Sequence, residues 1–90
     1  MLNIDNFKGY FSAEILHIAQ QYLFENLDIN LTENDEGCYD ARFCEDWVEH
    51  WAEITLDSDN MVEDCYCDKC KSLYCIHTAA TLLLISIAKQ

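Results

Sequence analysis

Four cysteines and one histidine lie within thirteen residues of this sequence, between Cys65 and His77. Cys65 and Cys67 are two residues apart, so on an extended strand both side chains leave the same face. Cys75 and His77 repeat this spacing after seven intervening residues. Three thiolates and one imidazole form the Cys3His ligand set of closed, tetrahedral structural zinc sites. The spacing therefore predicts one structural zinc ion bound by Cys65, Cys67, Cys75 and His77.

Cys70 is a fifth candidate ligand inside the same segment. Cys67 and Cys70 form a C-x-x-C pair, which is the spacing of zinc knuckles, so a ligand set with Cys70 in place of Cys65 is the alternative. Thioredoxin-like redox pairs share this spacing, but they open a helix in a βαβ unit, and the sequence shows no such unit. Buried free cysteines are also common, but five candidate ligands in thirteen residues favour a metal site.

The pattern indicates a structural metal rather than a catalytic one. A catalytic zinc keeps three protein ligands and an open position, whereas a full quartet is present here. No nearby glutamate has the H-E-x-x-H spacing of a general base, and the only glycines, Gly9 and Gly37, do not form a phosphate-binding loop. We therefore expect that the protein is not an enzyme.

The order C-x-C, seven residues, C-x-H resembles the SWIM zinc finger, whose pattern is C-x-C-x(n)-C-x-H. The matching positions are Cys65, Cys67, Cys75 and His77, and an apolar, helix-like run over 78–84 follows the histidine, as in SWIM fingers. The likeness covers about residues 46–88, and Cys70 is a departure from the pattern.

The resemblance implies a module for protein–protein or DNA interaction. SWIM domains occur in bacterial Swi/Snf-type helicases, in plant transposase-related proteins and in some ubiquitin-linked proteins. By this analogy the chain is a terminal or accessory domain of a larger protein such as a helicase, although no residue pattern here indicates a motor.

Hydrophobic periodicity predicts the elements that position these ligands. Ser12 is a suitable N-cap for a helix over 13–26, where apolar residues recur at helical spacing. Alternating residues predict strands over 27–32 and 38–44, joined by a turn at 34–37. The segment 45–56 fits a helix or a strand, with a strand from Ala52 onward. A turn at 57–60 and a strand over 61–66 complete a hairpin that ends in Cys65 and Cys67.

The final helix is predicted to open at 75–77 and to end near Lys89. Its apolar residues surround nearly the whole cylinder, which a small domain cannot readily bury, so we expect this helix to pack against more protein. Trp47 and Trp51 are expected in the core, with a binding surface as the alternative. Cys38 and Cys44 share a strand face but lie about 20 Å apart, so they are expected to be free thiols.

Ninety residues predict a single α+β domain over 1–90, with an N-terminal helix, an antiparallel sheet of three or four strands, a zinc hairpin and a C-terminal helix. The first residues lack the basic start and apolar stretch of a secretory signal, so a reducing, cytoplasmic location is expected. The longest apolar run, about ten residues near 79–88, is short of the roughly 20 that span a bilayer, so no membrane partner is expected.

The charge pattern favours a protein partner over nucleic acid. The formal charge is −12, and the segment 25–64 holds fourteen acidic residues against one base, Arg42. Nucleic-acid affinity depends largely on Lys and Arg, of which the chain has five. The acids form either a solvated face or a docking surface for a basic partner. A nucleic-acid-binding accessory finger, using Lys69 and Lys71, is the alternative function.

Overall fold

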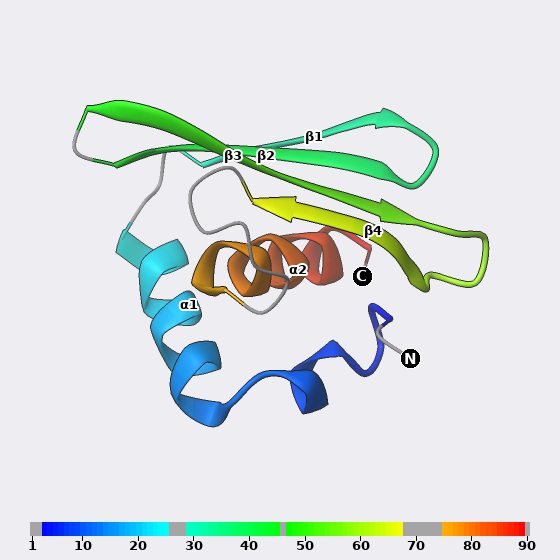
Figure 1. Ribbon diagram of the computed structural model, residues 1–90, viewed down its shortest axis with the longest axis horizontal. Coiled ribbons are helices and arrows are strands. Elements are labelled where there is room, and N and C mark those ends of the chain that lie inside the picture. The colour runs from blue at the N-terminus through cyan, green and yellow to red at the C-terminus, as the bar shows by residue number, and fades with distance from the viewer. Residues whose placement is uncertain (1–2, 26–28, 46, 68–74, 90) are drawn as a thin grey trace.

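The computed structural model describes residues 3–25, 29–45, 47–67 and 75–89, which form a small α+β domain (Figure 1). The elements, in chain order, are a 3-10 helix η1 (Phe7–Tyr10), α1 (Ala13–Glu25), β1 (Asn30–Asp35), β2 (Cys38–Glu45), β3 (Val48–Leu56), β4 (Val62–Cys67) and α2 (Ile76–Ala88). This confirms the predicted order of a helix, an antiparallel sheet and a C-terminal helix. Neither helix in the described part of the chain has the length and apolar character that a membrane crossing requires.

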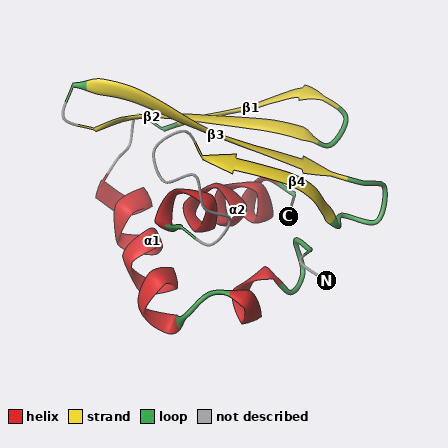
Figure 2. Ribbon diagram, viewed as in Figure 1, coloured by secondary structure: helices red, strands yellow, loops and turns green. Residues whose placement is uncertain are grey.

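The four strands form one antiparallel sheet in the order β1-β2-β3-β4, so each strand pairs with the next along the chain. Both α-helices lie on the same side of this sheet, with α2 next to it (Figure 2). On β2 the side chains of Tyr39, Ala41 and Phe43 are buried, as the predicted alternation requires. Cys38 and Cys44 occupy the alternate positions and are free thiols, as predicted.

The first strand starts and ends later than predicted. Its pairing with β2 runs from Asn30, opposite Arg42, to Asp35, opposite Cys38, which leaves only Glu36 and Gly37 in the turn. Gly37 has a φ of +82°, a conformation that glycine adopts without steric cost and that two-residue hairpin turns need. A Cβ at this position would also lie 2.4 Å from the carbonyl oxygen of Leu56.

Helix α2 lies in the middle of the domain, between the sheet and α1 (Figure 1). The expectation that a small domain could not bury it is wrong, because the sheet covers one side while α1 and the N-terminal segment cover the other. Ile87 alone is strongly exposed among the large apolar residues of this helix. The buried residues of α2 are His77, Thr78, Ala79, Ala80, Thr81, Leu82, Leu83 and Ile85.

Helix α1 begins as predicted, because the hydroxyl of Ser12 accepts a hydrogen bond from the backbone N–H of Ile15 at 3.1 Å. Ahead of it, Ile4, Phe7 and Phe11 are buried beside the helices. The backbone N–H of Ile4 donates to the carbonyl of Asn60 at 3.0 Å, which ties the start of the described chain to the turn between β3 and β4.

The uncertain segment 45–56 is a strand from Val48 onward, and both tryptophans lie outside the core. Trp47 is 98% exposed in the turn before β3, with a φ of 67°. Trp51 is 37% exposed, because it points to the face of the sheet that no helix covers. The inward positions of β3 are taken by smaller residues such as Ala52, which pairs with Ala41. The prediction that these tryptophans belong to the core is therefore wrong.

Candidate metal centre

Three of the predicted ligands come together where β4 ends and α2 begins. The ligand atoms of Cys67, Cys75 and His77 all lie within 4.8 Å of one another. Cys67 is the last residue of β4, Cys75 is the N-cap of α2 and His77 lies in its first turn. All three side chains are buried. The three candidate ligands therefore come from one strand and one helix.

The chemistry and spacing of these three groups fit a zinc ion. Zinc–sulfur bonds of about 2.3 Å in a tetrahedron place two sulfur ligands roughly 3.8 Å apart. The observed limit of 4.8 Å needs only a small contraction to reach that separation. Thiolates and imidazole are ligands that zinc prefers, whereas calcium and magnesium prefer oxygen ligands.

Thr78 organises the sulfur of Cys75. The backbone N–H of Thr78 donates to the Sγ atom of Cys75 at 3.3 Å, and the Thr78 hydroxyl lies 3.2 Å from the same sulfur. Burial alone would raise the pKa of Cys75, but hydrogen bonds from His77, Thr78 and Cys67 outweigh it and lower the pKa to about 6. Cys75 therefore ionises readily, as a metal-binding thiol must.

Cys65 lies beside this cluster rather than within the group of three. Its Sγ donates to the hydroxyl of Thr78 at 3.7 Å, so Cys65 and Cys75 contact the same oxygen. Burial raises the pKa of Cys65 to about 11, so this thiol is protonated at neutral pH when no metal is bound. Cys70, the alternative ligand, lies outside the described residues, so the choice of a fourth ligand stays a prediction.

Two aromatic rings hold the imidazole of His77. Phe43 of β2 stacks on it with ring centroids 4.8 Å apart and planes 7° apart. Tyr22 of α1 meets the imidazole edge-on, at a centroid distance of 5.5 Å and an angle of 86°. The sheet and both helices therefore contribute to the position of this one ring.

Sequence reasoning missed Thr78, Phe43 and Tyr22 as parts of the site. Each nevertheless carries a signal in the sequence. Thr78 is the third residue after the N-cap, where a backbone N–H normally bonds to the capping side chain. Phe43 lies on the inward face of its predicted strand, and Tyr22 on the apolar stripe of its predicted helix.

No protein-family model, curated protein or solved structure matches this chain.

Proposed function

We propose that this domain is a structural zinc module of the SWIM type, in which Cys65, Cys67, Cys75 and His77 hold one zinc ion. The observation that supports this most strongly is the cluster of three buried ligand atoms within 4.8 Å, contributed by β4 and α2. The sulfur of Cys65, which shares the Thr78 hydroxyl with Cys75, is the candidate for the fourth position in this proposal. Cys70 is the alternative fourth ligand.

The zinc in this proposal stabilises the fold and performs no reaction. It would join the end of β4 to the start of α2, and the free energy of metal binding would add to the stability of a domain of 90 residues. A reducing, cytoplasmic setting would keep the three cysteines available as thiols. Because the ligands are buried, no open coordination position for a substrate is part of this proposal.

The proposed role of the folded module is protein–protein interaction, as a terminal or accessory part of a larger protein such as a helicase. Its charge of −12 opposes binding to phosphate backbones. Among the described residues, the one arginine, Arg42, is already in contact with two carboxylates, Asp40 and Glu49.

Native mass spectrometry of the purified protein, before and after treatment with a chelator, tests the metal site. We expect one zinc per chain and a clear fall in the unfolding temperature once zinc is removed. Cys67→Ser should abolish stoichiometric zinc, whereas Cys44→Ser, on the outer face of β2, should retain it. A protein that holds no zinc and keeps the same unfolding temperature with the chelator would refute the proposal.

Two further variants identify the fourth ligand. Loss of zinc in Cys65→Ser but not in Cys70→Ser would support the SWIM ligand set, and the opposite result would assign Cys70. A DNA column tests the alternative function. The double variant Lys69→Glu, Lys71→Glu should elute with the unaltered protein, whereas weaker retention of the double variant would favour a nucleic-acid-binding finger.

A further inference from the structure

The helices in the described part of the chain all lie on one side of the sheet, and we call the other face the open face (Figure 2). Side chains on β2 and β3 alternate between the two faces, and those next to the buried Ala41, Phe43, Ala52 and Ile54 point away from the helices. The pairing of the strands places the outward residues side by side. The charged and aromatic members of the open face are Asp40, Arg42, Glu49, Trp51, Glu53, Asp64 and Tyr66.

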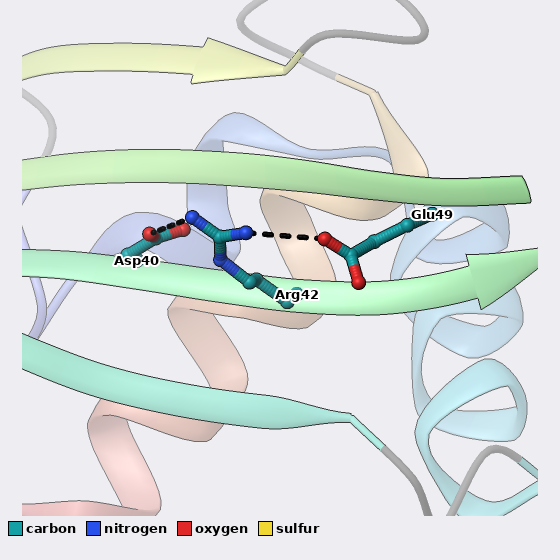
Figure 3. Close-up of polar contacts among 3 residues, drawn as sticks. All are labelled: Asp40, Arg42 and Glu49. Carbon is teal, nitrogen blue, oxygen red and sulfur yellow. Dashed lines mark hydrogen bonds and ion pairs between the residues drawn. The ribbon is translucent and has the colours of Figure 1, made fainter.

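Among the described residues of the open face, the one base already contacts two carboxylates. Arg42 contacts the carboxylates of Asp40 at 3.4 Å and Glu49 at 3.1 Å. Figure 3 shows these three side chains in front of the strands, with the helices behind the sheet. Hydrogen bonding to Glu49 and the charge of Asp40 raise the pKa of Arg42, so it stays protonated. The other two carboxylates on this face have no basic side chain opposite them in the strand pairing.

Two of the carboxylates are placed against each other. Asp40 of β2 pairs directly with Glu53 of β3, and like charges in opposite positions destabilise a sheet. The Asp40 side chain is only 13% exposed, and its Oδ1 atom has no hydrogen-bond partner among the described residues. A cation bound beside Glu53 would relieve this repulsion.

Two aromatic side chains lie among these acids. Trp51 stands opposite Arg42, and Tyr66 stands opposite Glu53 on the neighbouring strand. They are 37% and 43% exposed, so part of each ring is available to a ligand. Aromatic faces attract Lys and Arg head groups and also cover the aliphatic stems of these side chains.

We propose that the open face binds an extended, Lys- and Arg-rich segment of a partner protein. The carboxylates would bind the cationic head groups, and Trp51 and Tyr66 would contact the aliphatic parts of the same Lys and Arg side chains. The charge of the face argues against the other occupants: nucleic acid and anionic lipid would be repelled, and so would the same acidic face of a second copy. This inference rests on the proposed role in protein interaction and names the chemical class of the partner.

Fluorescence polarisation with the zinc-loaded full chain tests this inference. The probe is a labelled peptide of alternating arginine and alanine, and the comparison peptide has glutamate in place of arginine. We expect saturable binding of the arginine peptide alone, weakened by salt. Glu53→Gln should weaken binding about threefold, Trp51→Ala about fivefold, and the double variant about tenfold or more.

Two matched variants on α1 distinguish peptide binding at the open face from non-specific attraction of a basic peptide to an acidic protein. Glu14→Gln makes the same charge change as Glu53→Gln, and Phe24→Ala removes an aromatic ring that is fully as accessible as that of Trp51. Both should keep the affinity within about twofold. Equal losses of affinity for the arginine peptide in the α1 and open-face variants, or no saturable binding of that peptide, would overturn the inference.

Zinc content, measured on the same samples, distinguishes the two proposals. A protein that holds one zinc but fails to bind the arginine peptide would refute the open-face inference and leave the zinc module intact. A protein that binds the peptide through Trp51 and Glu53 without holding zinc would support the open-face inference and refute the zinc module.

Discussion

The imidazole of His77 lies stacked on the ring of Phe43, with centroids 4.8 Å apart and planes 7° apart. Phe43 is buried on β2, while His77 begins α2, so this contact joins the sheet to the helix that carries two of the candidate ligands. A ligand whose orientation is fixed before the metal arrives loses less entropy on binding. Phe43 therefore positions a candidate ligand without being a candidate ligand itself.

Phe43→Leu should lower zinc affinity about tenfold, because the imidazole would lose the ring that fixes its plane. Competition with a coloured chelator measures this change. Phe11→Leu, at another buried phenylalanine of the core, is the matched control and should cost similar stability while leaving zinc affinity nearly unchanged. Equal affinities in the two variants would show that the stacking does not position His77.

Thr78→Val should also weaken zinc binding about tenfold, since hydrogen bonds to charged groups are among the strongest. The substitution keeps the side-chain shape but removes the hydroxyl that lies 3.2 Å from the Cys75 sulfur. Thr81→Val is the control, because the Thr81 hydroxyl donates to the backbone carbonyl of His77 at 2.7 Å and contacts no sulfur in the described contacts. The same loss of affinity in both variants would indicate a general effect on α2.

The metal-free protein should gain stability as the pH rises, through Cys75. Its pKa is lowered from 9.0 to about 6 on folding, so the thiolate stabilises the fold fully above pH 9.0 and this contribution is lost as the pH falls through about 6. Urea unfolding between these two pH values measures the free energy of unfolding of the unaltered protein and of Cys75→Ser. As the pH rises, the unaltered protein should gain on the order of 1–2 kcal/mol relative to Cys75→Ser, allowing for partial solvent screening. Serine retains the N-cap at this position.

Cys65→Ser provides the contrast for this titration. Burial raises the pKa of Cys65 from 9.0 to about 11, so below pH 9 this thiol is largely neutral in both the folded and the unfolded chain. The difference in the free energy of unfolding between the unaltered protein and Cys65→Ser should therefore change little over most of the pH range below 9. A flat difference for Cys75→Ser as well would show that its thiol is not ionised in the fold.

The strand pattern of this domain could be read from the sequence because alternation is local. Tyr39, Ala41 and Phe43 are buried as the pattern on β2 predicted. Alternation does not reveal which residues at the end of a strand lie beyond the covering helix, nor whether both faces are covered. The large side chains of Trp47 and Trp51 suggested burial, but one lies in a turn and the other on the open face.

The environment of the final helix and of the candidate metal site depends on contacts between distant parts of the chain. The apolar circumference of α2 suggested an external partner, because the sequence does not show that α1 and the sheet enclose it from two sides. The spacing of Cys67, Cys75 and His77 predicts that they converge, and their ligand atoms lie within 4.8 Å of one another. The contacts of Phe43 and Tyr22 with His77 come from separate elements, so spacing alone could not predict them.

Gly37→Ala should destabilise the domain by about 2–4 kcal/mol. The φ of +82° is unfavourable for alanine, and the new Cβ would lie 2.4 Å from the carbonyl oxygen of Leu56. The Leu56 N–H also donates a hydrogen bond to the Gly37 carbonyl at 2.7 Å. The two backbone segments therefore cannot move apart to make room for the Cβ without breaking this hydrogen bond. Gly9→Ala, with no atom within 4 Å of the new Cβ, should change the free energy of unfolding by less than about 0.5 kcal/mol.

Trp47→Gly should raise the free energy of unfolding by about 0.5–1 kcal/mol. A residue with a Cβ needs roughly 1–2 kcal/mol to adopt the φ of 67° seen at Trp47. Glycine avoids this cost but loses more chain entropy on folding, by roughly 0.5–1 kcal/mol, so a smaller net gain remains. The indole is 98% exposed, so its removal leaves no cavity. Thermal and urea unfolding measure the change.

Asn60→Gly is the control for this substitution, because asparagine tolerates its φ of 62° and should gain little from the change. A loss of stability in Trp47→Gly would mean that the indole contributes to the fold despite its exposure. A gain, by contrast, would mean that the chain carries a strained and solvent-exposed tryptophan that folding does not need. Loss of peptide binding in that more stable variant would then extend the interaction surface from the open face to the turn between β2 and β3.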